Sequence, residues 1–303
     1  MMMDRFAAME VLVKVIDTGS FSAAARQLGV GQPAISKTIA QLETRIGVKL
    51  LLRSTRGLSP TEAGQRYYEH AQRALDAAHE ADLAATGAAA GLTGRLRFAA
   101  PVTFARLHLM PRLPAFIAQH PALAIDAILD DRRVDLIEES IDVALRIGTL
   151  ADSTATAQRV GAARRIVVGT PAFFARHGEP RRPADLARYP AATYLQTGGG
   201  SVWTFRNGNT DETETATLDD ALRTTAAEGM REAVFADIAL CVTTEWMFRD
   251  ELASGRVVEV LADWHLPTLD LWAVFPGGRR IGAKARAFAN FVADASLGTM
   301  AAG

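Results

Sequence analysis

The 303-residue sequence predicts an α/β protein overall, with a mainly helical N-terminal domain, one long helix and a larger α/β domain. Three observations predict this. Residues 18–47 have the pattern of two short helices joined by a glycine-containing turn. Residues 61–86 carry a seam of small side chains at helical spacing. Beyond residue 94, strand-length apolar runs alternate with helical patterns, which indicates sheets with helical crossovers.

The two short helices form a predicted helix-turn-helix. Ser20 is placed to cap the first helix, Gly29 begins the turn, and Pro33 opens the second helix, where its missing N–H costs little. Apolar spacings of four, three and four predict the buried stripe of the second helix, which consists of Ile35, Ile39, Leu42 and Ile46. A preceding amphipathic helix, predicted to cover the back of this pair, carries Phe6, Met9, Val13 and Ile16.

The remaining face of the second helix is polar and suits a DNA major groove. It carries Gln32, Ser36, Lys37, Thr38 and Gln41. Glutamine can read adenine through two hydrogen bonds, and lysine can reach guanine. The alternative interpretation is an ordinary helical hairpin with a solvated polar face.

A short hairpin is predicted after the second helix. The alternating residues Val48, Leu50 and Leu52 indicate a strand, and Gly57 permits the turn of a wing. The wing tip, residues 53–56, can contact phosphates or enter a minor groove. Residues 20–60 hold six basic residues against the single acid Glu43, which is the charge pattern expected for phosphate binding, although a solvated basic surface also explains it.

A long helix is predicted from residue 61 to about residue 86. Its seam of alternating spacings allows close approach of a second helix, as in a coiled coil, and consists of Tyr67, Ala71, Ala74, Ala78, Ala81 and Ala85. The alternative is a helix packed on its own domain. The glycine-containing segment 87–94 is the predicted hinge to the second domain.

The second domain is predicted to contain alternating strands and helices. Strands are expected at 95–101, 123–130, 142–148, 164–170, 191–197, 238–244, 257–263 and 269–276. Helices are expected at 104–121, 134–141, 184–190, 219–237, 246–255 and 283–297.

Polar residues at strand ends are candidates for a ligand site, because ligands of open α/β sheets bind beyond the carboxyl ends of strands. A helix opening after Pro101 also offers backbone N–H groups to an anion. Taken singly, each of these residues also serves as a cap or turn residue. The candidate effector-binding residues are Pro101, Val102, Thr103, Phe104, Asp130, Asp131, Arg146, Tyr194, Gln196 and Thr243.

No catalytic, cofactor or metal site is predicted. The six histidines are scattered without HExxH spacing, and neither a GxSxG elbow nor a GxGxxG loop after a strand occurs. Cys241 lies in an apolar run and is expected to be a buried thiol in a reducing compartment. The first sixteen residues lack a signal-peptide pattern and no apolar run is long enough to span a bilayer, so we expect a cytoplasmic protein without a membrane partner.

The segment SFSAAARQLGVGQPAISKTIAQLETRIGVKLLLRSTRGLSPTEAGQRYYEHA resembles the winged helix-turn-helix of LysR-type transcriptional regulators. The resemblance includes the QPA-S core and the LL-R-T…L-TEAG exit, and it extends more weakly over residues 91–303. One departure is Gly31, where many members carry a capping serine. The resemblance implies DNA contacts by Ser22, Gln32, Pro33, Ser36, Lys37, Thr38, Arg53, Ser54, Thr55 and Arg56.

The resemblance also implies a domain organisation. It consists of a winged helix-turn-helix at 1–60, a linker and dimerisation helix at 61–90, and an effector domain at 91–303. The effector domain is expected to be periplasmic-binding-protein-like, with subdomain I at about 91–161 and 267–303 and subdomain II at about 162–266.

The implied function is sequence-specific transcriptional regulation controlled by a small-molecule effector, for which a carboxylate is one candidate. The implied partners are a dyad-symmetric DNA operator, further copies of the chain in a homodimer or homotetramer, and RNA polymerase. Two alternatives remain at this point: a DNA-binding module fused to an α/β enzyme, and an architectural DNA-binding protein without ligand control.

Overall fold

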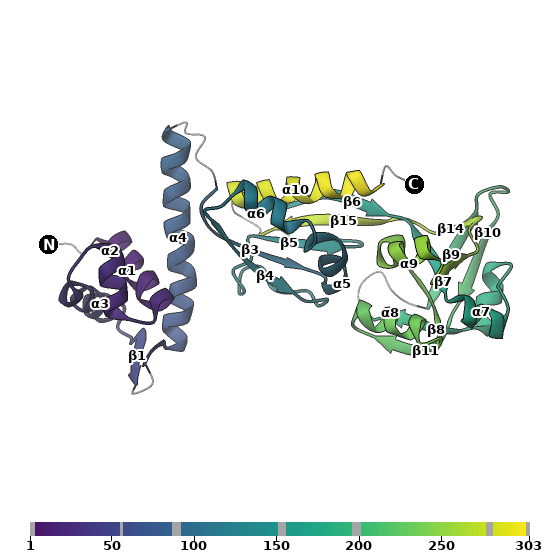
Figure 1. Cartoon of the computed structure of the whole chain (residues 1–303), viewed down its shortest axis with the longest axis horizontal. Coiled ribbons are helices and arrows are strands. Elements are labelled where there is room, and N and C mark those ends of the chain that lie inside the picture. Colours follow the sequence, from purple (N-terminus) through teal and green to yellow (C-terminus); the bar gives the residue numbers. More distant parts are fainter. Residues whose placement is uncertain are drawn as a thin grey trace. The chain divides into compact units, whose positions relative to one another are not determined.

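The computed structural model describes residues 4–54, 57–86, 92–150, 156–195, 201–276 and 281–300. The chain divides into two compact units, an N-terminal unit of residues 1–90 and a C-terminal unit of residues 91–303 (Figure 1). Most of the predicted hinge, residues 87–91 of 87–94, lies outside the described residues.

The N-terminal unit is a helical bundle with a two-stranded wing (Figure 1). Its elements are α1 (Arg5–Thr18), α2 (Phe21–Leu28), α3 (Gln32–Ile46), β1 (Leu51–Ser54), β2 (Gly57–Pro60) and α4 (Glu62–Thr86). The wing strands pair antiparallel. Helix α1 contacts α2, α3 and α4, so it is the central helix of the bundle.

Local sequence signals set the helix-turn-helix. The Ser20 hydroxyl accepts a hydrogen bond from the Ala23 N–H at 3.3 Å and caps α2. Gly29 ends α2 in the left-handed region with φ of 66°, which glycine adopts without a steric penalty. Gly31 is the N-cap residue of α3, and no side chain caps this helix in place of the serine that many similar sequences carry there.

The buried faces of α1 and α3 differ in part from the predicted stripes. Ile35, Ile39 and Leu42 are buried, but Ile46 is 38% exposed because it is the last residue of α3, beyond the core cluster. Phe6 is 52% exposed. The fully buried residues of α1 are instead Ala8, Leu12 and Val15, because this helix is packed on several sides rather than on one.

Helix α4 joins the wing through an unusually close backbone contact. A Cβ atom added to Gly64 would lie 1.9 Å from the carbonyl oxygen of Leu50, so only glycine fits at this position. The Thr61 hydroxyl donates to the Lys49 carbonyl at 2.8 Å and accepts from the Gly64 N–H at 2.8 Å. The TEAG segment therefore fixes where α4 leaves the wing.

The C-terminal unit contains two α/β subdomains. Subdomain I is built on a five-stranded sheet of order β4-β3-β5-β15-β6. Its strands are β3 (Gly94–Ala100), β4 (Leu123–Leu129), β5 (Val143–Ile147), β6 (Thr156–Ala163) and β15 (Leu269–Phe275). Its helices are α5 (Val102–Phe104), a π-turn (Ala105–Leu109), α6 (Leu113–Gln119) and α10 (Ala283–Met300), with Phe98 of β3 stacked on Phe288 of α10 at 4.6 Å.

Subdomain II is built on a five-stranded sheet of order β11-β8-β12-β7-β13, with a separate antiparallel sheet of order β10-β9-β14. The strands are β7 (Arg165–Gly169), β8 (Pro190–Tyr194), β9 (Val202–Asn207), β10 (Thr213–Thr217), β11 (Asp219–Thr224), β12 (Leu240–Thr244), β13 (Val258–Val260) and β14 (Trp264–His265). The helices are α7 (Pro171–His177), a 3₁₀ turn (Pro183–Arg188), α8 (Ala227–Phe235), a second 3₁₀ turn (Glu245–Phe248) and α9 (Arg249–Ser254).

The chain passes between the subdomains through β6, which is paired antiparallel with β15. The expected boundary between residues 161 and 162 lies within β6, whose last residue is Ala163. Neither strand β6 nor the β9–β10 hairpin was predicted from the sequence, since both contain many polar and small residues.

Three predicted helices of the C-terminal unit differ from the structure. Residues 134–141 form only turns, and Ser140 at φ of 56° interrupts helical geometry. The helix expected over 219–237 is split into β11 and α8, because β11 pairs in parallel with β8 and the Thr224 hydroxyl accepts a hydrogen bond from the Ala226 N–H. The helix expected over 104–121 is also divided, consistent with prolines at 111 and 114.

No helix among the described residues is both long and apolar enough to cross a membrane.

We predict that Gly64→Ala lowers the free energy of unfolding of the N-terminal unit by about 1–3 kcal/mol, because the new methyl group overlaps the Leu50 backbone. Hydrogen–deuterium exchange of residues 4–86 measures the change. Gly31→Ser is the matched control and is expected to be neutral or slightly stabilising, because the nearest atom to its Cβ is 3.6 Å away and serine can cap α3. Equal destabilisation by the two variants would contradict the close-contact argument.

Candidate functional site

The exposed face of α3 presents most of the residues expected to contact DNA. Gln32, Pro33 and Lys37 are exposed, and Ser36 is half-buried. The hydroxyl of half-buried Thr38 donates to the Ala34 carbonyl at 3.0 Å, so it is engaged within its own helix.

The other candidate DNA contacts lie on α2 and on the wing. Ser22 is exposed on α2, and its hydroxyl lies 3.0 Å from that of Ser20. Arg53 and Ser54 end strand β1, which places their backbone at the start of the wing turn. Thr55 and Arg56 lie outside the described residues.

A buried acid supports the surface between α3 and the wing. Glu43 is 8% exposed and accepts hydrogen bonds from the Leu50 N–H at 2.9 Å and the Leu51 N–H at 3.3 Å, as well as from the Lys49 ammonium. Burial alone would raise the pKa of Glu43, but these hydrogen bonds and the charge of Lys49 outweigh it and lower the pKa. Glu43 therefore fixes the wing to α3, a role that its sequence position did not reveal.

The C-terminal unit contains a cavity of about 170 Å³ between its two subdomains. Residues from both subdomains line it, and most candidate effector residues are among them. The candidates that line the cavity are Pro101, Thr103, Phe104, Asp130, Asp131, Arg146, Tyr194 and Thr243. Val102 is not among the lining residues, and Gln196 lies outside the described residues.

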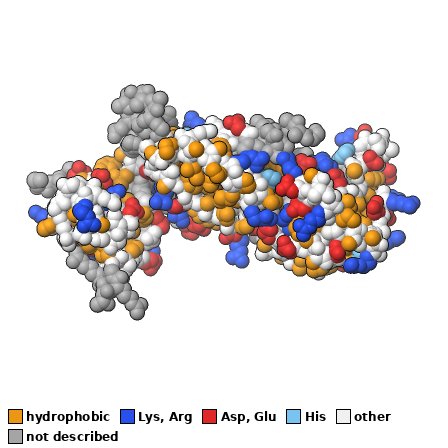
Figure 2. All heavy atoms as spheres, viewed as in Figure 1, with side chains coloured by type: hydrophobic (Ala, Val, Ile, Leu, Met, Phe, Trp, Pro, Cys, Tyr) orange, Lys and Arg blue, Asp and Glu red, His pale blue; other side chains and the backbone are white. Residues whose placement is uncertain are grey.

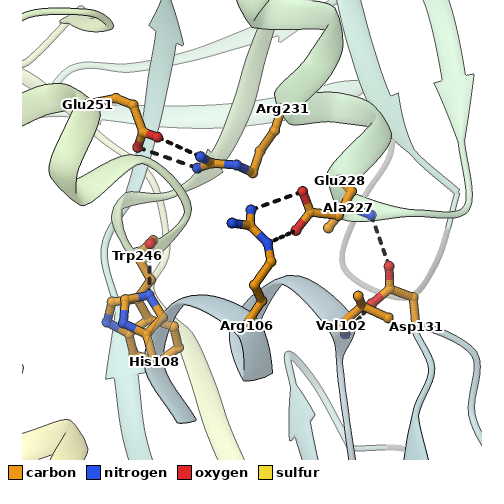
Figure 3. Close-up of polar contacts among 9 residues, drawn as sticks. All are labelled: Val102, Arg106, His108, Asp131, Ala227, Glu228, Arg231, Trp246 and Glu251. Atoms are coloured by element: carbon orange, nitrogen blue, oxygen red, sulfur yellow. Dashed lines mark hydrogen bonds and ion pairs between the residues drawn. The ribbon is translucent and has the colours of Figure 1, made fainter. Parts of the chain in front are cut away.

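The Asp131 carboxylate bridges the first residues of two helices, one from each subdomain (Figure 3). One oxygen accepts from the Val102 N–H of α5 at 2.9 Å, and the other accepts from the Ala227 N–H of α8 at 3.0 Å. The Val102 N–H, which was expected to bind a ligand anion, therefore binds a carboxylate of the protein itself. Burial, followed by the charges of Asp131 and Asp130, raises the pKa of Tyr194 in the same cavity.

Two further polar contacts cross the same boundary (Figure 3). The Arg106 guanidinium donates two hydrogen bonds to the Glu228 carboxylate, at 2.9 and 3.0 Å. The Nε2 atom of His108 lies 2.8 Å from the Trp246 carbonyl oxygen. Together with Asp131, these contacts hold α5 and the π-turn of subdomain I against α8 and the 3₁₀ turn of subdomain II.

Three buried polar atoms of cavity-lining residues have no hydrogen-bond partner among the described residues: Thr103 Oγ1, Arg165 Nε and Trp203 Nε1. Thr103 was predicted from the sequence, but Arg165 and Trp203 were not. Arg165 is the first residue of β7, whereas the predicted site residues follow the ends of strands. Because β7 runs antiparallel to β12, Arg165 lies opposite Thr244, at the end of β12 that faces the cavity. No sequence signal revealed this antiparallel pairing.

Among the described residues, no group of three or more His, Cys, Asp or Glu side chains is placed to hold a metal ion. Cys241 is fully buried, and burial raises the pKa of its thiol.

Comparison with known proteins identifies the family through both units. Residues 6–65 match the model of the bacterial regulatory helix-turn-helix protein, lysR family, and residues 89–296 match the model of the LysR substrate binding domain. The chain belongs to the LysR family of transcriptional regulators. The N-terminal unit therefore contains the helix-turn-helix of a LysR-type regulator, and the cavity lies in its substrate-binding domain.

Relatives match this LysR-type regulator over nearly its whole length. An HTH-type transcriptional regulator of Xanthomonas campestris is 34% identical over 286 residues, which cover 93% of this chain and 83% of the relative. The structure of CrgA, a LysR-type transcriptional regulator from Neisseria meningitidis, is 26% identical with a TM-score of 0.60 and covers 95% of this chain and 97% of that chain. Full-length AphB of Vibrio cholerae shares the fold, with 24% identity, a TM-score of 0.57 and coverage of 95% and 98%.

The surface of the substrate-binding domain fits this family assignment. On the face seen in Figure 2, basic and acidic side chains are interspersed over subdomain II rather than separated by sign. This visible face therefore lacks the strong basic field that a DNA-wrapping surface requires.

We predict that Glu43→Gln destabilises the N-terminal unit by about 1–3 kcal/mol at neutral pH, because charge-assisted hydrogen bonds to Lys49, Leu50 and Leu51 are weakened. The pKa of Glu43 is lowered in the folded state, so its contribution is fully present above the unfolded-state pKa of about 4.3 and is lost as the pH falls through the folded-state pKa. Thermal melts across pH measure this. The control Glu62→Gln changes an acid whose side chain is 85% exposed and should have little effect. A pH-independent difference between wild type and Glu43→Gln would contradict the assignment.

We predict that Asp131→Asn loosens the contact between the subdomains, because an amide offers one acceptor oxygen to two backbone donors. The amide proton of Ala227 should exchange with solvent at least several-fold faster, as measured by hydrogen–deuterium exchange. Asp130→Asn is the matched control, since the Asp130 carboxylate accepts a local hydrogen bond from the Arg132 N–H and bonds to no other described residue. Unchanged exchange at Ala227 in Asp131→Asn would show that the bridge does not hold the subdomains together.

Proposed function

We propose that this LysR-type regulator reads a dyad-symmetric operator as a homo-oligomer and that a small molecule bound between subdomains I and II controls it. The observation that carries the DNA-reading part is the exposed polar face of α3 on a helix held by its buried back. Such a helix fits a major groove, and its first residues contact base edges.

The proposed division of work separates base reading from phosphate binding. Gln32, Pro33, Ser36 and Lys37 read or flank bases, while Arg53 and Arg56 hold the DNA backbone. The salt bridge of Lys49 with Glu43 supports this assignment, because a lysine that is paired within the protein is less available to phosphate.

The proposed effector site is the cavity between the subdomains. Thr103, Arg146, Tyr194 and Thr243 line it from opposite subdomains, so a ligand that contacts both walls favours one arrangement of the subdomains over another. Such differential binding is the physical requirement for control of DNA binding by an effector. We infer that the domain regulates and does not catalyse, as its relatives are named as regulators.

We further propose that α4 is the dimerisation helix, that a dimer or tetramer forms, and that RNA polymerase is a downstream partner in the bacterial cytoplasm. Ala74, Ala78 and Ala81 support the first point, because small residues permit close helix approach, whereas Ala71 is fully buried within its own unit. A dimer places two copies of α3 on half-sites related by a two-fold axis.

The proposed function is tested by selection of DNA fragments with the purified full-length protein at two salt concentrations. Enrichment of one dyad-symmetric site is the expected result. Salt-sensitive binding without a preferred sequence would contradict sequence-specific regulation.

We predict that Lys37→Ala weakens operator binding about ten- to a hundredfold and relaxes discrimination at one base pair. Arg53→Ala should weaken binding to all sequences and lower the slope of log affinity against log salt by about 1. Arg206→Ala, in the C-terminal unit, is the control and should bind as wild type. Titrations at several salt concentrations measure both effects. Altered base preference with an unchanged salt slope in Arg53→Ala would reverse the assignment of roles.

A further inference from the structure

One wall of the cavity combines a cation with an indole ring. The guanidinium carbon of Arg165, on β7, lies 5.0 Å from the ring centroid of Trp203, on β9. Trp203 is 8% exposed and Arg165 is half-buried. Both side chains line the cavity from subdomain II.

Both side chains have an N–H donor without an acceptor. Arg165 Nε and Trp203 Nε1 are buried and make no hydrogen bond among the described residues. Arg165 also makes no salt bridge with any described carboxylate, whereas its neighbour Arg164 is paired with Glu259 and Glu245. Burial lowers the pKa of Arg165, because the guanidinium loses water contacts and no described carboxylate compensates its charge.

Three other arginines line the cavity from subdomain I: Arg132 is exposed to solvent, and Arg133 and Arg146 donate to the carbonyl oxygens of Thr149 and Val134. The N-terminus of α8, a further cationic feature of the cavity, is already neutralised. Its first N–H donates to the Asp131 carboxylate, and its first turn carries Glu228, which is paired with Arg106. A ligand anion placed there would face the existing carboxylates instead of free donors. The unpaired donors of Arg165 and Trp203 are therefore a more favourable anion site than the start of α8.

Part of the cavity lining is apolar. Phe104, Met230, Val242 and Trp246 line the cavity and are each 8% exposed or less. Such a wall suits a hydrocarbon or aromatic body, and its burial would supply most of the ligand's affinity.

We propose that Arg165 and Trp203 form the subsite that selects the effector, and that this effector is a carboxylate with an apolar body. The proposal rests on the proposed effector cavity and names its ligand class. The Arg165 guanidinium presents parallel N–H donors to the two carboxylate oxygens, and the Trp203 indole N–H donates a further hydrogen bond. The subsite lies on subdomain II, away from the helix start at Val102 where the sequence analysis expected an anion.

The test measures binding of matched probe pairs to the full-length protein by thermal shift and calorimetry. The probes are phenylacetate, cinnamate and hexanoate, each compared with its primary amide. At least one carboxylate should bind, and its neutral amide should bind at least about tenfold more weakly, since hydrogen bonds to charged groups are the stronger ones.

Variants then separate the subsite from the rest of the cavity. Arg165→Gln should weaken the carboxylate about ten- to a hundredfold and remove its preference over the amide. Trp203→Phe keeps a ring and removes only the N–H, so it should weaken binding several-fold. Arg206→Gln, on the same strand as Trp203 but paired with Asp211 at the surface, is the control and should bind as wild type.

Three results would overturn the proposal: no carboxylate of the panel binds, the amides bind as well as the carboxylates, or Arg165→Gln retains the carboxylate affinity. Each of these differs from a failure of the proposed function. That failure appears in the DNA selection experiment, which contains no effector and does not depend on Arg165.

Discussion

The arrangement of the two subdomains in the C-terminal unit depends on one carboxylate that accepts hydrogen bonds from the N-termini of two helices. Asp131 accepts hydrogen bonds from the first N–H of α5 and from the first N–H of α8. These donors belong to different subdomains, and helix N-termini carry a partial positive charge that favours such a group. The same cavity that separates the subdomains is therefore bridged at one edge by the protein's own anion. This bridge occupies two backbone donors, and the buried cavity donors left unpaired among the described residues lie on α5, β7 and β9.

The N-terminal unit shows a comparable dependence on two contacts between elements distant in sequence. Glu43 ties α3 to the start of the wing through the Leu50 and Leu51 N–H groups, and Gly64 lets α4 approach the same Leu50 backbone. Helix α3, the wing and helix α4 thus meet around Leu50. This geometry explains physically why the TEAG segment has threonine at its first position and glycine at its last.

Much of the N-terminal unit could be predicted because its signals are local. Ser20 caps α2 and Gly29 ends it in a left-handed conformation, and the helical period of Ile35, Ile39 and Leu42 matches the buried face of α3. These features depend on residues within one or two turns of each other. The predictions failed where distant parts of the chain determine whether a residue is buried. Ile46 continues the helical spacing of the apolar residues of α3, but no part of the core covers it.

By itself, the sequence determined the winged helix-turn-helix, the long helix after it, the α/β character of the remaining chain and several residues of the cavity. Capping, glycine turns and apolar periodicity are properties of short segments and can be seen without a fold. Only the tertiary structure decided that residues 219–224 form a strand, that Asp131 occupies the donors offered to a ligand, and that Arg165 borders the cavity. Each of these depends on a pairing between distant segments, β11 with β8, Asp131 with α8 and β7 with β12, and no local pattern records which distant segment will be the partner.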